Sequence, residues 1–207
     1  IRVFGGLAPG RWVLAGSVDF EARHIFDGPQ EGWRDAIGEF DVYAYWQPLA
    51  LPRHTLFARI SGAAGWSMTV PFQLTLGGSS NLRGHGLGHA PGGRRLMGSF
   101  EDRIYLGSPA GSLFDLGLTV FLDVGSVWRG DTPFGSDSGF GASAGAGLRV
   151  GFPGGTRGVI RIDLAFPVNG PGAFREPVFR ITAAELLGLL QGFEDPQLRR
   201  SRRSASG

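Results

Sequence analysis

The chain has 207 residues, with 36 glycines, no cysteine, 20 basic and 18 acidic residues and a net charge of +2. The absence of cysteine excludes a disulfide framework and a thiolate metal site, and no apolar run reaches the roughly 20 residues of a membrane-spanning helix. Every basic residue is arginine, and the first basic block comes only at residues 199–203, so nucleic-acid binding has little support.

Apolar and polar residues alternate along most of the chain, which is the signature of β-strands. Residues 1–8 already follow a short version of this pattern, and we expect the chain to be a fragment that begins inside a sheet. The alternation predicts about ten strands. Apart from residues 1–8, the stretches that carry it are 12–22, 34–46, 55–61, 70–76, 99–103, 114–124, 140–152, 160–166 and 178–182.

One face of the predicted strands is almost free of charge, while the other carries Asp, Glu, Arg, Ser and Gly. Strands of about 9–13 residues, joined alternately by short turns and long loops, suit an outer-membrane barrel. Four tryptophans lie near predicted strand ends, where an aromatic girdle would sit: Trp12, Trp46, Trp66 and Trp128. We therefore expect an all-β, antiparallel transmembrane barrel. A soluble β-sandwich or lipocalin-like barrel also alternates and stays an alternative.

The glycine-rich stretch at residues 77–86 reads GGSSNLRGHG and carries one charge, Arg83. Two later strands each offer one acid on the polar side, Glu101 and Asp123. The planar guanidinium of arginine suits two carboxylates, and glycines allow the backbone to lie against a wall. The pattern suggests a loop tucked into a barrel and held by charge; a surface hairpin with a solvated arginine is the open alternative. Asp102 would then point outward, near a membrane interface.

The C-terminal residues are less regular. Residues 178–183 alternate, but residues 184–190 suit either a continued strand or a short helix. Residues 194–207 have the composition of a disordered basic tail. We therefore expect a barrel portion over residues 1–193 followed by a tail over 194–207.

Four motifs stand in a specific order along the chain. The first is Gly77-Gly78 with Leu82-Arg83-Gly84-His85, and Glu101 follows it. The later ones are Phe121-Leu122-Asp123-Val124-Gly125, residues 145–149 and residues 160–167. Over about residues 70–168, this pattern resembles the Omp85 superfamily, the outer-membrane barrels also called the bacterial surface antigen (D15) family.

The resemblance implies a barrel of about 16 strands, of which this chain would supply about the last ten. It also implies that residues 77–96 are a long extracellular loop folded back into the lumen. Residues Leu82, Arg83, Gly84 and His85 match the loop-tip motif, with a histidine where the family usually has another aromatic residue. Glu101 and Asp123 match the inward acids that hold the arginine. The family tends to end on an aromatic residue, whereas here the last one, Phe193, precedes the tail.

Other candidate sites are weaker. His85 and His89 are separated by glycines that exclude a helix, so a zinc site is not expected. Asp131 and Asp137 could bind calcium weakly or be solvated in their loop. No cofactor or metal is implied. The other charged residues expected in the lumen are Arg103, Arg149, Arg161 and Asp163. We expect inward-facing acids to pair with inward-facing arginines there.

The resemblance leads us to expect an outer-membrane barrel that inserts or translocates polypeptide and is not an enzyme. Its expected partners are unfolded or nascent outer-membrane or secreted polypeptide, lipid, and periplasmic domains that would precede Ile1. Two alternatives stay open. One is a barrel that anchors, or forms a pore for, a soluble domain, which would not need a pinned loop. The other is an outer-membrane hydrolase, although His24 and His54 have no evident nucleophile partner.

Overall fold

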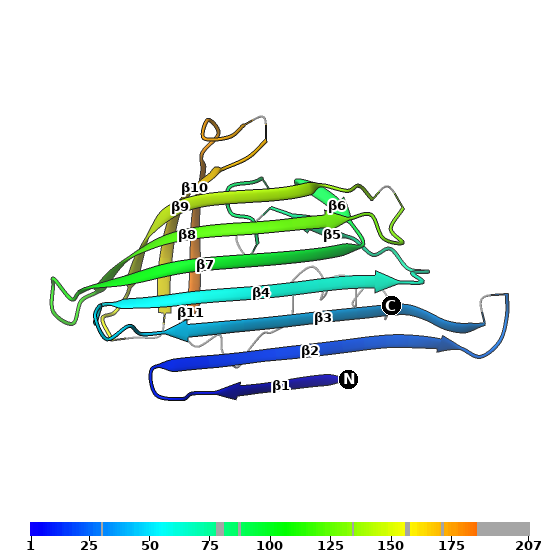
Figure 1. Ribbon diagram of the computed structural model, residues 1–207, viewed down its shortest axis with the longest axis horizontal. Helices are drawn as coiled ribbons and strands as arrows, with labels where there is room; N and C mark the ends of the chain where they lie inside the picture. The colour runs from blue at the N-terminus through cyan, green and yellow to red at the C-terminus, as the bar shows by residue number, and fades with distance from the viewer. Residues whose placement is uncertain are drawn as a thin grey trace.

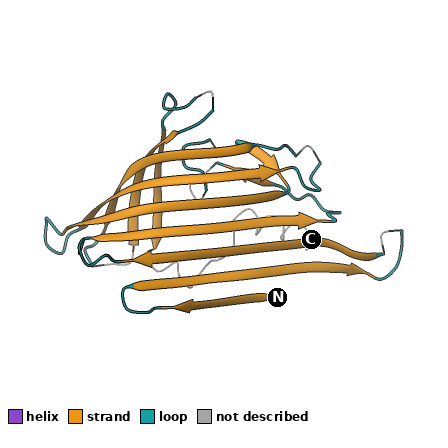
Figure 2. Ribbon diagram, in the orientation of Figure 1, coloured by secondary structure: helices purple, strands orange, loops and turns teal. Residues whose placement is uncertain are grey.

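The computed structural model describes residues 1–29, 31–77, 81–86, 88–133, 135–155, 158–170 and 172–185, with the side chains of the last two residues left out. These residues form strands and loops but no helix (Figure 2), so they contain no helical segment able to cross a membrane. The strands of the main sheet are β1 (Arg2–Leu7), β2 (Trp12–Ile25), β3 (Gly32–Trp46), β4 (His54–Trp66), β7 (Arg94–Gly107), β8 (Asp115–Trp128), β9 (Gly139–Gly151), β10 (Gly158–Pro167) and β11 (Val178–Glu185).

The main sheet has nine strands in the order β1-β2-β3-β4-β7-β8-β9-β10-β11, and every neighbouring pair is antiparallel. Figure 1 shows the sheet curling, so that β10 and β11 cross the direction of the other strands. The expectation of an all-β antiparallel fold is confirmed. Within the described residues the sheet is open, with β1 and β11 at its edges, and it has nine strands where about ten were expected.

The two faces of the sheet have opposite polarity, because successive side chains of a strand point to opposite sides. On β8, Thr119 and Asp123 are at most 1% exposed, while Val120 and Leu122 are 56% and 45% exposed. We call the face that carries Asp123 the inner face and the opposite one the outer face. Polar side chains are therefore buried on the inner face and apolar side chains are exposed on the outer one.

The prediction of a wall strand at residues 70–76 is wrong. Only β5 (Leu74–Leu76) is a strand there, and it pairs with β6 (Ala90–Gly92) in a separate two-stranded sheet. The alternation has another cause, because Phe72 and Leu74 are buried together with Ile37 and Ala63 of the wall. The segment alternates because one of its sides packs against the sheet, and this pattern looks the same in sequence as that of a wall strand.

One connection is much longer than the others. It runs from residue 67 to residue 93 between β4 and β7, so it begins ten residues earlier than the predicted 77–96, and residues 94–96 belong to β7. Antiparallel order places the connections β2–β3, β4–β7, β8–β9 and β10–β11 at one end of the sheet, and the connections β1–β2, β3–β4, β7–β8 and β9–β10 at the other. The predictions for residues 186–193 and for the tail at 194–207 lie outside the described residues.

Candidate functional site

The site is built around the turn that presents Arg83 to the inner face. Asn81 shapes this turn: its side-chain oxygen accepts hydrogen bonds from the backbone N–H groups of Gly77 (2.9 Å) and Leu82 (2.5 Å). Its amide nitrogen donates to the carbonyl of Thr75 at 3.0 Å. An asparagine that satisfies nearby backbone groups in this way is a common means of fixing a turn.

Apolar packing holds both sides of the turn against the wall. Leu82 is completely buried in a cluster with Leu76 and Ala90 of the connection and with Met97 and Val127 of β7 and β8. Burying a leucine side chain contributes roughly 1.5–3 kcal/mol. The residue before Arg83 therefore anchors the loop tip by burial.

Gly84, directly after Arg83, lies against the wall on strands β9 and β10. A Cβ atom at this position would lie 2.5 Å from the Cβ of Ser143 and 2.7 Å from the carbonyl carbon of Phe166. Such distances are far below van der Waals contact, so only glycine fits without a shift of the wall or the loop. Contact between the loop and the wall thus requires the glycine of the predicted motif.

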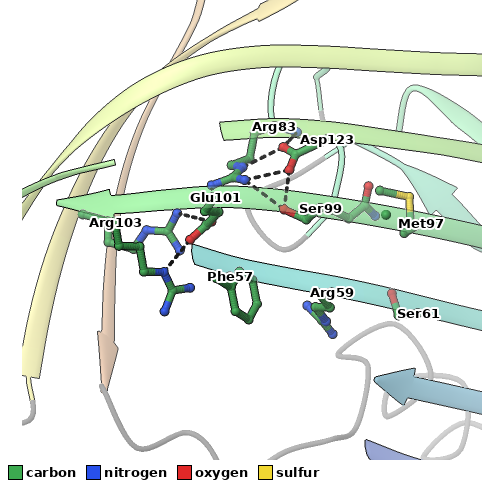
Figure 3. Close-up of a pocket in the computed structure, with 12 residues that line it drawn as sticks. Phe57, Arg59, Ser61, Arg83, Met97, Ser99, Glu101, Arg103 and Asp123 are labelled. Carbon is green, nitrogen blue, oxygen red and sulfur yellow. Dashed lines mark hydrogen bonds and ion pairs between the residues drawn. The ribbon is translucent and has the colours of Figure 1, made fainter. Parts of the chain in front are cut away.

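Arg83 contacts both of the acids that were singled out for it (Figure 3). Its Nε and Nη2 donate to the two oxygens of Asp123, each at 2.6 Å, and its Nη1 donates to Oε1 of Glu101 at 2.7 Å. Nη2 also donates to the hydroxyl of Ser99 at 3.1 Å. The bidentate pair with Asp123 is the geometry in which guanidinium and carboxylate bind most strongly.

These charges are withdrawn from solvent, since the side chains of Arg83 and Asp123 are 3% and 1% exposed. Burial alone would lower the pKa of the Arg83 guanidinium, but the hydrogen bonds and charge of Asp123, with the charge of Glu101, raise it above its usual value. The guanidinium carbon also lies 3.6 Å from the centre of the Phe121 ring, a cation–π contact. Arg83 is therefore a fixed, permanently charged anchor.

Glu101 is shared by four arginines. Besides Arg83, it accepts hydrogen bonds from Arg103 (2.8 Å), Arg149 (2.8 Å) and Arg161 (3.1 Å). Arg161 also donates to Asp163 at 3.2 Å. The structure thus brings together in one cluster all the charged residues predicted for the lumen, on strands β7 to β10.

Sequence reasoning missed Arg180 of β11. Its Nε and Nη2 donate to the backbone carbonyls of Arg83 (3.0 Å) and His85 (2.6 Å), on both sides of Gly84. β11 pairs with β10 so that Arg180 lies opposite Asp163. The inward-facing position of Arg180 on the last predicted strand was the sequence feature that could have identified it. The arginine ties the loop tip to the edge strand of the sheet.

The histidines and loop acids of the weaker candidate sites contact one another or other parts of the described chain. The rings of His85 and His89 lie 4.6 Å apart, yet no cluster of three metal-ligating side chains occurs within the described ranges. His54 hydrogen-bonds Asp102 at 2.9 Å on the outer face. The backbone N–H groups of Ser67 and Arg129 donate to Asp131 and Asp137. The ring of His24 is tilted against that of Phe26, with centroids 4.6 Å apart, and meets that of Trp33 edge-on at 5.0 Å.

Comparison with known proteins identifies one family. The model of the Omp85 superfamily domain matches residues 52–183, which is more than half of the chain. The match includes Arg83 and all the charged residues that surround it, and it extends beyond residues 70–168, where the sequence motifs lie. No curated protein matches the chain.

Proposed function

The chain belongs to the Omp85 superfamily, and from this premise we propose that its sheet forms part of an outer-membrane β-barrel that inserts or translocates polypeptides. We propose further that the connection 67–93 braces the lumen of that barrel through Arg83. Membership of this superfamily supports an outer-membrane role in polypeptide insertion or translocation.

The polarity of the sheet supports a membrane location. A soluble protein buries its apolar face, whereas here apolar side chains such as Val120, Leu122 and Phe100 are 45–56% exposed on the outer face. Lipid-facing apolar and lumen-facing polar residues alternate in this way in membrane barrels. The four tryptophans of the predicted girdle lie at strand ends and are 37–47% exposed: Trp12, Trp46, Trp66 and Trp128.

The observation that carries the proposed brace is the burial of Arg83 between Asp123 and Glu101. Breaking a buried ion pair by removing one partner typically costs about 3–5 kcal/mol. Such a contact would hold a long connection against the inner face far more firmly than surface packing alone. A barrel that served only as an anchor for a soluble domain would not need it. Neither strand exchange nor a pore requires a cofactor.

The proposal is tested with the full-length protein reconstituted in phospholipid vesicles. One assay follows the folding of a urea-unfolded outer-membrane barrel protein into these vesicles, and a second follows protease protection of a secreted polypeptide inside them. We expect the parent protein to accelerate one of the two processes. The activity of the variant Arg83→Ala should be at least ten-fold lower than that of the parent. The control Arg175→Ala, which removes an exposed arginine from the connection 168–177, should be as active as the parent.

Three results would count against the proposal. Inactivity of the parent protein in both assays would favour a barrel that anchors or forms a pore for another domain. Full activity of a folded Arg83→Ala variant would refute the proposed brace but would leave the proposed insertion or translocation activity standing. A loss of activity in Arg175→Ala equal to that in Arg83→Ala would show that the effect is not specific to the site.

A further inference from the structure

A cavity of about 150 Å³ lies beside the Arg83 cluster on the inner face. Strands β4, β7, β8 and β10 and the loop tip line it. The side chains that matter here are Arg161 and five that Figure 3 labels: Phe57, Arg59, Arg83, Glu101 and Arg103. The brace uses one wall of this cavity, where Arg83 meets its acids. Arg103 and Arg161, which also line it, make no hydrogen bond to the loop among the described residues.

The cluster beside the cavity carries more positive than negative charge. Its carboxylates are Glu101, Asp123 and Asp163, and they face five arginines: Arg83, Arg103, Arg149, Arg161 and Arg180. Arg59 adds no surplus, because both of its bonds go to Asp41. Buried charges of one sign are unfavourable unless they are paired. The inner face therefore offers an uncompensated cationic site at the cavity.

Two of the lining arginines have donors to spare. Arg103 directs Nε to Glu101, and its Nη1 and Nη2 have no hydrogen-bond partner among the described residues. Arg161 directs Nη2 to Glu101 and Asp163, while its buried Nε has no partner in the same part of the chain. A buried oxygen without a partner, Asp163 Oδ1, belongs to a residue outside the cavity lining.

Aromatic rings hold Arg103 in place. Its guanidinium carbon lies 4.2 Å from the centre of the Phe57 ring and 5.2 Å from that of Tyr45. The stacked side chain is thereby held with Nε against Glu101, which leaves the edge formed by Nη1 and Nη2 as the open one. Such an edge presents two parallel N–H donors, the arrangement that matches the two oxygens of a carboxylate.

We propose that this cavity binds a carboxylate group of a polypeptide that occupies the lumen, with Arg103 and Arg161 as the binding residues. The inference rests on the proposed function, because a polypeptide is the substrate class of the family. The open edge of Arg103 would take both carboxylate oxygens, and Arg161, which also lines the cavity, would attract the carboxylate by its charge. Binding would neutralise part of the surplus charge without displacing Arg83 from its acids.

The test uses two peptides that differ only at the C-terminus, titrated against the full-length protein in detergent micelles at low ionic strength. The first is trifluoroacetyl-tetraglycine with a free carboxylate, and the second is its C-terminal amide; ¹⁹F NMR reports binding of either. We expect saturable binding of the free acid and none of the amide. Arg103→Gln and Arg161→Gln should each weaken binding at least ten-fold. Arg175→Gln, which removes an equal charge at an exposed site, should bind like the parent.

The comparison of acid and amide on the parent protein needs no variant, so it decides the question even if a variant does not fold. Equal binding of both peptides, or of neither, would overturn the inference, and so would parent-like binding by folded Arg103→Gln and Arg161→Gln. A parent protein that inserts or translocates polypeptide but binds neither peptide overturns this inference alone. One that binds the acid but is inactive in both vesicle assays overturns the proposed function alone.

Discussion

The contact between Arg83 and Asp123 allows a quantitative test of the brace. In Arg83→Met, a side chain of similar length keeps the packing but loses the charge. Asp123, which is 1% exposed, would then keep the hydroxyl of Ser99 at 2.7 Å but no guanidinium. Glu101 would still be paired with three arginines. We expect a loss of about 3–5 kcal/mol in the free energy of unfolding, mostly from the stranded carboxylate of Asp123.

A second substitution shows where this cost arises. Asp123→Asn in the Arg83→Met background removes the stranded charge, so the double variant should be more stable than the sum of the two single losses predicts. The coupling energy should lie at the upper end of the about 0.5–3 kcal/mol found for residues in contact. The matched cycle with Glu101→Gln should give a smaller coupling, because Glu101 retains other partners when Arg83 is lost.

The assay is urea-induced unfolding of the full-length protein in phospholipid vesicles, followed by tryptophan fluorescence. Additive losses for Arg83 and Asp123 would refute the reasoning, because they would mean that the two charges do not depend on each other. A coupling with Glu101 larger than that with Asp123 would refute it as well. Such a result would mean that Arg83 is coupled mainly to Glu101, which it shares with other arginines, and not to Asp123, which it binds with two hydrogen bonds.

Three further variants or conditions test the contacts of the loop tip. Gly84→Ala forces a Cβ to within 2.5 Å of the wall, and overpacking of this kind should cost about 1–3 kcal/mol in urea unfolding; an unchanged midpoint would contradict the close approach. Arg180→Gln removes two hydrogen bonds to tip carbonyls, so hydrogen exchange at residues 82–86 should speed up while β8 stays protected. Burial holds the pKa of His85 below its usual value of about 6.5. As pH falls below about 6.5, the unfolded chain protonates His85 before the folded chain does, so the free energy of unfolding should decrease. The variant His85→Gln should lose this part of the pH dependence. An unchanged pH profile in the variant would contradict the assignment to His85.

The sheet was largely predictable because most of its strands carry apolar side chains on one face and polar side chains on the other. On β8, the apolar residues Leu118, Val120 and Leu122 alternate without a break, and the strand extends over that stretch. The same rule failed at residues 70–76, because a loop that packs one side against the wall has the same period of two. A wall strand and a packed loop segment differ in their pairing partners, and the period of the sequence pattern does not reveal those partners.

The candidate site was predictable where it follows a motif and not where it depends on register. The motif points to Arg83 and its two acids. That Arg149 and Arg161 also reach Glu101 depends on the pairing of β7 with β8, of β8 with β9 and of β9 with β10, and on the curl of the sheet. Arg180 was missed for another reason. Its partners are backbone carbonyls, which every residue has, so the sequence holds no complementary side chain.

Of the two acids that hold Arg83, Asp123 is the one that limits release of the loop tip. If the tip withdrew, Glu101 would keep three cations, whereas Asp123 would keep only the hydroxyl of Ser99. Release of the brace therefore requires water or another cation to reach Asp123 at the moment Arg83 leaves. The leucine before Arg83 is completely buried and the glycine after it lies against the wall, so this packing and the ion pair are lost together when the tip withdraws. The connection 67–93 should accordingly leave the inner face in one cooperative step and not by gradual fraying from the tip.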